Sequence, residues 1–153
     1  MNSLRKNQYR LEELMPLFRE QLAAGSCVRF FPNGTSMLPM IRQGVDSVTL
    51  APLPERLKKH DLPLYQRDNG QFVLHRIVHV GQTLTCIGDN QFDKEYNLRH
   101  DQMIGLVVAF SRNGKEYSGT VWRYWLYCRF WYYSRPLRHV WRKGCYWLRR
   151  HLK

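Results

Sequence analysis

Short segments rich in β-forming residues occupy the middle of this 153-residue chain, and a turn signal follows most of them. One such signal, Asp68-Asn69-Gly70, lies between two apolar runs, which is typical of a hairpin. This spacing predicts antiparallel sheets and therefore a mainly β (α+β) fold. The predicted strands are Val28–Phe31, Ser47–Leu50, Leu62–Arg67, Phe72–Val80, Thr83–Gly88 and Met103–Arg112.

A single amphipathic helix is expected before these strands, over residues 4–24. Its apolar residues recur at helical spacing, and a glycine follows them as a stop signal. Three glutamates lie in the same segment, so it would cross a bilayer only at high cost. The chain also opens without the apolar segment of a secretory signal. The apolar residues are Leu11, Leu14, Met15, Phe18 and Leu22.

Charge divides the chain into two parts. The net charge is +12, yet residues 1–120 carry only +3, because residues 121–153 contain nine basic residues and no acidic one. All five tryptophans also lie in that last segment. We therefore expect a folded domain over residues 1–118 and a basic, aromatic C-terminal tail over residues 119–153.

The tail allows three interpretations. Its tryptophans and arginines suit an anionic membrane surface, through residues 121–153. Alternatively, they suit nucleic acid, or they form a helix that packs on the domain and keeps a solvated basic face. A nucleic-acid partner is the least favoured, because the one N-terminal helix is no helix-turn-helix.

The cysteines predict neither a metal site nor another cofactor. A tetrahedral zinc site usually needs closely spaced ligand pairs, and no CxxC pair occurs in the chain. Four scattered cysteines in a chain of this length also differ from a secreted disulfide scaffold, so reduced thiols are expected. They are Cys27, Cys86, Cys128 and Cys145.

Three short segments are candidates for chemistry, although each also has a purely structural explanation. Ser36 lies in a Gly/Pro loop, Gly34–Pro39, where most serines simply form turns. His75 interrupts an apolar strand, and a histidine there is usually a hydrogen-bonded structural group. Gly88-Asp89-Asn90, followed by Asp93, is a typical turn sequence.

Taken in order and followed by Ile104-Gly105-Leu106-Val107, these segments resemble the signal peptidase and LexA-like serine peptidases (S24/S26). The resemblance covers residues 11–112. It implies coiled antiparallel β-sheets and a serine endopeptidase that cleaves a peptide or precursor protein in signal-peptidase-like processing. It also implies a shallow groove in which an extended peptide substrate adds as a strand.

The resemblance assigns Ser36 as the nucleophile and His75 as its base. Many members use a lysine at the second position, so this chain resembles the Ser–His variant. An acid should orient the imidazole, and Asp93 is the preferred candidate. Asp89 is the alternative, although it could instead have only a structural role in the Gly88-Asp89-Asn90 turn. Backbone around the serine would bind the oxyanion and substrate, although Gly34 occupies a position where signal peptidases often have a serine. The residues expected there are Gly34, Thr35, Met37 and Pro39.

Two other functions remain open. The chain could be a catalytically inactive relative that binds extended peptides. It could also be a LexA-like regulator that cleaves itself, with Ala24-Gly25 as a weak candidate for the cut site. Because the tail is basic and no spanning segment is expected, the predicted location is cytoplasmic, peripheral on the inner face of the membrane.

Overall fold

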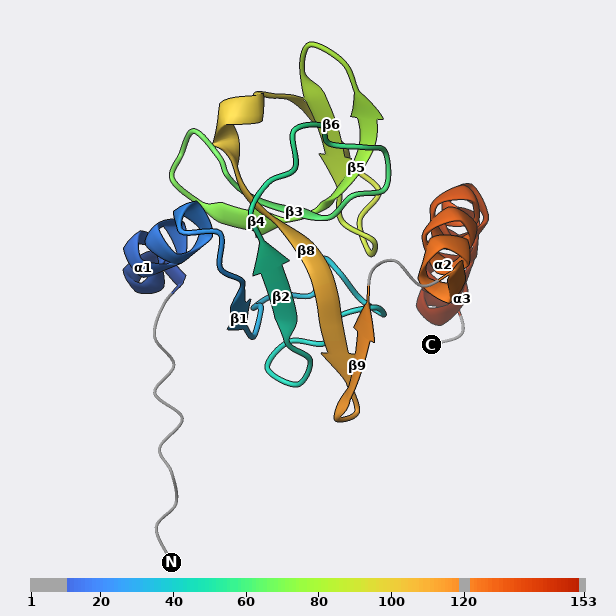
Figure 1. The fold of residues 1–153 in the computed structure, drawn as a ribbon. Helices are drawn as coiled ribbons and strands as arrows, with labels where there is room; N and C mark the ends of the chain where they lie inside the picture. The colour runs from blue at the N-terminus through green and yellow to red at the C-terminus, as the bar shows by residue number, and fades with distance from the viewer. Residues whose placement is uncertain (1–10, 119–121, 152–153) are drawn as a thin grey trace, which may run out of the picture.

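The computed structural model describes residues 11–118 and 122–151 (Figure 1). The chain begins there with helix α1 (Leu11–Ala23), which confirms the described part of the helix expected over residues 4–24; residues 4–10 lie outside the described ranges. Three buried side chains of α1 face the sheet, and the ring of Phe18 packs against Phe30 with centroids 5.6 Å apart. Gly25, at φ +78°, ends the helix in a conformation that favours glycine.

Two antiparallel sheets form the rest of the domain, which confirms the mainly β fold. The larger has the order β1-β2-β8-β3-β4, with β9 pairing β8; the smaller has the order β5-β6-β7. The strands are β1 (Val28–Phe30), β2 (Val48–Ala51), β3 (Pro63–Gln66), β4 (Phe72–Leu74), β5 (Arg76–Val80), β6 (Leu84–Ile87), β7 (Glu95–Leu98), β8 (Met103–Arg112) and β9 (Lys115–Ser118).

The strand predicted over Phe72–Val80 is divided. Its first part, β4, pairs with β3 in the larger sheet, whereas β5 pairs with β6 in the smaller one. His75 lies at the break between them. Residues 73–78 are all buried, as expected for a segment that passes between two sheets and is covered on both sides. The change of sheet thus puts His75 inside the molecule.

Two hydrophobic clusters hold the fold together. The larger joins α1 to the six-stranded sheet and includes Met37, Met40 and Ile41 from the loop that follows β1. The smaller contains Tyr65, Val73 and residues of β5, β6 and β7. Because the serine loop contributes three side chains to the larger cluster, its position is fixed by core packing.

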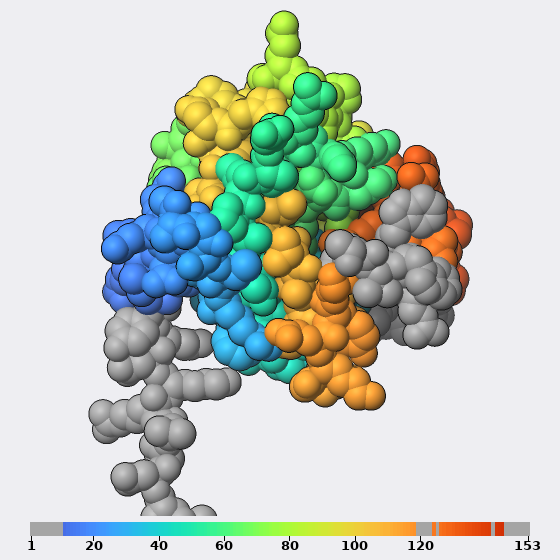
Figure 2. Space-filling model, in the orientation of Figure 1, coloured from blue at the N-terminus to red at the C-terminus, as the bar shows by residue number. Residues whose placement is uncertain are grey.

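The tail forms two helices, α2 (Trp122–Tyr133) and α3 (Arg135–His151), which lie on the flank opposite α1 (Figures 1 and 2). Cys128 of α2 is buried, and Tyr124 and Tyr127 pack against the larger cluster. One face of α2 therefore packs on the β-sheets. Within the described ranges, no helix combines the length and apolarity that crossing a bilayer requires.

Candidate active site

Ser36 lies on a turn that follows β1 and is anchored by its neighbours. Met37 and Met40 are buried in the core, whereas Ser36 is partly exposed. Gly34 has φ +96°, which favours glycine, and lets the chain turn just before the serine. Among the described residues, neither the Ser36 hydroxyl nor its backbone N–H has a hydrogen-bond partner in the protein. Both groups are therefore available to a ligand.

A second turn, residues 88–90, supports the backbone of Ser36 directly. The N–H of Asn90 donates to the Ser36 carbonyl at 2.8 Å, and the Asn90 side chain donates to the Thr35 carbonyl at 3.2 Å. A Cβ at position 88 would lie 2.8 Å from the Ser36 carbonyl oxygen and 3.0 Å from its Cβ. Only glycine allows this close approach, which explains the Gly-Asp-Asn sequence at the turn.

His75 is oriented by hydrogen bonds at one ring nitrogen. Its Nδ1 lies 2.8 Å from Oε1 of Glu95 and 3.2 Å from the Tyr65 hydroxyl. Since a carboxylate only accepts hydrogen bonds, Nδ1 carries the proton and Nε2 keeps its lone pair. The side chain of His75 is 2% exposed, so the ring has little freedom to reorient.

Arg67 holds Glu95 in its ionised form. Its Nε donates to Glu95 Oε2 at 2.8 Å, and its Nη2 donates to Oε1. Burial raises the pKa of Glu95, but the hydrogen bonds from Arg67 and Tyr65 outweigh that effect and bring the pKa below its usual value. The carboxylate next to His75 is therefore charged at neutral pH.

Burial also sets the protonation state of His75. Desolvation lowers the pKa of the imidazole, and the opposing attraction of Glu95 is smaller, so the pKa lies below its ordinary value of 6.5. The ring is thus neutral at pH 7 and can accept a proton at Nε2. A neutral histidine held by a carboxylate is the arrangement that general-base chemistry needs.

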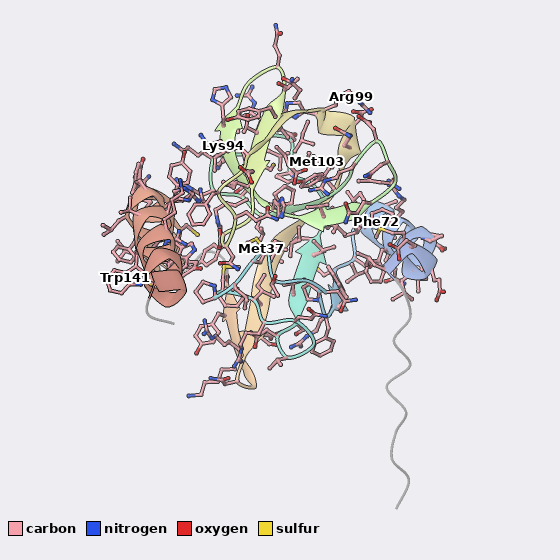
Figure 3. The ribbon with its side chains drawn as sticks, turned by 180° about the vertical axis from the view of Figure 1, so that it is seen from behind. Met37, Phe72, Lys94, Arg99, Met103 and Trp141 are labelled. Carbon is pink, nitrogen blue, oxygen red and sulfur yellow. The ribbon has the colours of Figure 1, made fainter. Side chains whose placement is uncertain are left out.

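Ser36 and His75 line the same pocket, of about 270 Å³. Gly34, Thr35 and Met37 also line it, as expected from the sequence, whereas Pro39 does not. Met37 lies near the centre of the molecule (Figure 3). The remaining lining comes from Pro32, Asn33, Ile41, Arg67, Gln71, Gln91 and strand β4.

A second hollow, of about 350 Å³, adjoins the first. Arg67 and Gln91 line both of them, and residues 90–95 form the rest of the second. The two hollows thus meet at the Arg67 side chain, which also binds Glu95. The second hollow therefore continues the surface of the Ser36–His75 pocket past Arg67 toward residues 90–95.

The structure places neither of the two aspartates expected from the sequence against His75. Glu95 contacts His75, whereas Asp93 is exposed and has no hydrogen bond or ion pair with any described residue. Asp89 forms a buried, two-pronged ion pair with Arg76, at 2.9 and 2.8 Å. Glu95 was missed because it begins β7, a strand that the sequence pattern did not predict.

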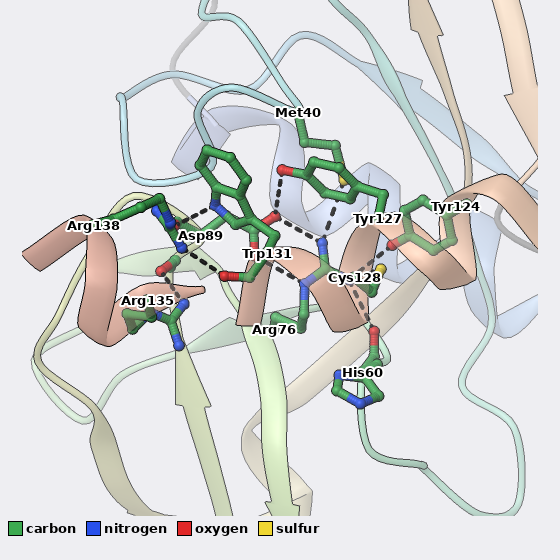
Figure 4. A network of polar contacts seen from close by, with 11 residues as sticks. Met40, His60, Arg76, Asp89, Tyr124, Tyr127, Cys128, Trp131, Arg135 and Arg138 are labelled. Carbon is green, nitrogen blue, oxygen red and sulfur yellow. Dashed lines mark hydrogen bonds and ion pairs between the residues drawn. The ribbon is translucent and has the colours of Figure 1, made fainter. Parts of the chain in front are cut away.

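Asp89 and Arg76 lie at the centre of a polar network that joins the tail to the serine loop (Figure 4). Arg76 also donates to the Tyr124 hydroxyl and Cys128 sulfur of α2, each at 3.0 Å. Trp131 Nε1 donates to the Asp89 carbonyl at 2.8 Å, and Arg135 donates to the Gly88 carbonyl at 3.2 Å. The tail helices therefore bind the same 88–90 turn that supports Ser36, which agrees with the interpretation of the tail as a helix that packs on the domain.

No protein-family model and no curated protein sequence matches the chain.

Proposed function

We propose that this protein is a serine endopeptidase whose catalytic residues are Ser36 and His75, with Glu95 orienting the histidine. The observation that carries the proposal is the 2.8 Å contact between His75 Nδ1 and Glu95, which leaves Nε2 unprotonated on a ring that lines the same pocket as Ser36. The ordered motifs that resemble signal peptidase and LexA-like enzymes support this proposal. From the same motifs we also propose that the chain has the fold of those enzymes. The proposed reaction is hydrolysis of a peptide or precursor protein.

The proposed mechanism follows from these positions. Ser36 Oγ attacks the scissile carbonyl carbon, and its proton passes to His75 Nε2. The unpartnered N–H of Ser36 stabilises the resulting oxyanion. His75 then gives its proton to the departing amine, which leaves an acyl-enzyme at Ser36. Water, deprotonated by His75, attacks that ester and releases the acid product together with free Ser36.

Glu95 and Arg67 support the histidine throughout these steps. While His75 carries a second proton it is a cation, and the Glu95 carboxylate offsets that charge in a buried site. Arg67 holds both carboxylate oxygens, so Glu95 stays fixed and ionised as His75 gains and loses its proton. In this scheme Arg67 is a positioning residue.

An extended peptide is the proposed substrate form. Strand β4 is the last strand of its sheet and, among the described residues, pairs only with β3, so its other edge has no described partner strand. Phe72, Val73 and Leu74 of β4 line the pocket beside Ser36 and His75. A substrate that adds to this edge would pass the nucleophile with its backbone hydrogen-bonded and its side chains alternating between pocket and solvent.

The test is a comparison of protein N-termini in the native host by mass spectrometry. Strains would carry the wild type, Ser36→Ala, Glu95→Gln or the matched control Asp93→Asn. We expect N-termini that disappear in Ser36→Ala, weaken in Glu95→Gln and persist in Asp93→Asn. Identical N-termini in the wild type and Ser36→Ala, with both proteins folded by circular dichroism, would overturn the proposal.

A non-catalytic peptide-binding function is the second candidate. One observation favours it: the Ser36 hydroxyl has no hydrogen bond to His75. Under this alternative, Ser36→Ala leaves both the N-termini and peptide capture unchanged. Self-cleavage of the LexA-like kind is tested by intact mass, since only the wild type would lose an N-terminal fragment.

A further inference from the structure

The outer face of the tail helices carries a stripe of exposed apolar side chains. Successive members lie three or four residues apart along α2 and α3, except that the last two are adjacent, and all are 46–74% exposed. A helix with that spacing presents them along one side. We call this the outer face; it consists of Leu126, Phe130, Tyr133, Leu137, Val140 and Trp141.

The contacts of α2 with the β-sheets fix the direction of the outer face. Tyr124, Cys128 and Trp131 face inward, where they bind Arg76 and the Asp89 carbonyl. Arg138 of α3 donates to the Trp131 carbonyl at 2.6 Å and stacks on its ring. Since these contacts hold the helices against the domain, the helices cannot rotate about their axes to bury the outer face. Exposed apolar surface of this extent marks an interaction site.

Charge identifies the kind of partner. No acidic residue follows Glu116, and residues 121–153 carry nine basic residues. Arg129 and Lys143 are exposed on the same two helices. A second copy of this chain would bring nine further positive charges against the first nine, which opposes association through this face. An anionic bilayer offers an apolar layer and negative headgroups together, and it matches both properties.

We propose that α2 and α3 lie on an anionic lipid surface, with the outer face inserted among the headgroups and upper acyl chains. Tyr133 and Trp141 suit that depth, because their rings are amphipathic. No helix in the described ranges can span a bilayer, so the helices lie in the plane of the interface. Anionic lipid is abundant in the cytoplasmic leaflet, and the protein would be peripheral there. This binding does not require the peptidase activity proposed above.

The experiment is flotation of the full-length protein with phosphatidylcholine vesicles that contain or lack phosphatidylglycerol. The test variant combines Phe130→Ala, Leu137→Ala and Trp141→Ala. The matched control removes three apolar side chains elsewhere that are 51–64% exposed, by Leu17→Ala, Val45→Ala and Tyr96→Ala. Ser36→Ala serves as a further control that separates this inference from the peptidase proposal, and circular dichroism verifies that each variant is folded.

We expect the wild type, the matched control and Ser36→Ala to float with anionic vesicles and to dissociate as salt is raised. The outer-face variant should bind more than about tenfold less tightly, because three large apolar side chains no longer enter the bilayer. Wild-type binding by the outer-face variant would overturn the proposal, as would equal binding of the wild type to vesicles without phosphatidylglycerol. Two further outcomes would overturn it: self-association that is lost in the outer-face variant, or binding to a single-stranded oligonucleotide that is lost in that variant. In either case the variant would still bind vesicles.

Discussion

The replacement Asp89→Ala should strongly destabilise the protein, because it leaves a buried cation without its counter-ion. Arg76 and Asp89 are each 2% exposed and share two hydrogen bonds, at 2.9 and 2.8 Å. After the replacement, Arg76 would keep only neutral acceptors, such as the His60 carbonyl and the Tyr124 hydroxyl. Removing one partner of such a pair typically costs about 3–5 kcal/mol of folding free energy.

That loss is large against the roughly 5–15 kcal/mol that stabilises a typical domain. For a chain of this size, each kcal/mol shifts Tm by about 2–4 °C, so Asp89→Ala should lower Tm by about 6–20 °C. The assay is urea and thermal unfolding at pH 7, followed by circular dichroism and tryptophan fluorescence. Asp93→Ala is the matched control: it removes an exposed aspartate without a described partner, and we expect a change within about 0.5 kcal/mol.

A double replacement separates loss of the pair from loss of packing. Arg76→Met combined with Asp89→Leu removes both charges and keeps apolar volume, so it should be less destabilising than Asp89→Ala alone. If Asp89→Ala instead costs less than about 1 kcal/mol, no more than an ordinary hydrogen bond, the reasoning from an unpaired buried charge is refuted. The same conclusion follows if the double variant is the least stable of the three.

Three further predictions concern the proposed site. Because the base must be neutral and burial lowers the pKa of His75 from its ordinary value of 6.5, the cleavage rate should be constant at pH 7–8 and should fall only at a pH below 6.5, as the ring is protonated; a rate that already falls between pH 8 and pH 7 would contradict this. Glu95→Gln should lower kcat by about 10³- to 10⁴-fold with a smaller effect on KM, whereas steady-state kinetics of Asp93→Asn should match the wild type. Gly88→Ala should lower the free energy of unfolding by about 1–3 kcal/mol in urea and reduce activity, because the new Cβ would lie 2.8 Å from the Ser36 carbonyl oxygen. Gly144→Ala, which has open space around it, should cause neither loss, and equal effects of the two replacements would refute the packing argument.

The fold was predictable where the sequence signals are local. The strand predicted over Met103–Arg112 coincides with β8, and the Asp68-Asn69-Gly70 turn joins β3 to β4 as a hairpin. Strands β7 and β9 were missed. Every residue of β9 is exposed, so no alternation marks it, and Asn97 in β7 has φ +58°, which interrupts the regular pattern.

The site was predictable only in part, for a similar reason. Ser36 and His75 lie in short motifs that can be recognised along the chain. Glu95 reaches His75 through the pairing of β7 with β6, where it is opposite Cys86, and such a register cannot be read from adjacent residues.

The alternation of side chains explains why Asp89 contacts Arg76 and not His75. His75 and Arg76 are consecutive in an extended segment, so their side chains point in opposite directions. The histidine meets Glu95 on one side, while the arginine meets Asp89 on the other. One acid could not serve both residues. The pair His75-Arg76 therefore requires two carboxylates, one for the proposed chemistry and one for the buried charge.

That division of roles also connects the two proposals made for this chain. Asp89 and Gly88 accept hydrogen bonds from Trp131 and Arg135 through their backbone carbonyls, while the next residue, Asn90, donates to the Ser36 carbonyl. The helices that carry the outer face and the loop that carries Ser36 thus bind one three-residue turn. Because Arg76 anchors that turn from within the core, the position of Ser36 and the orientation of the outer face depend on the same buried ion pair.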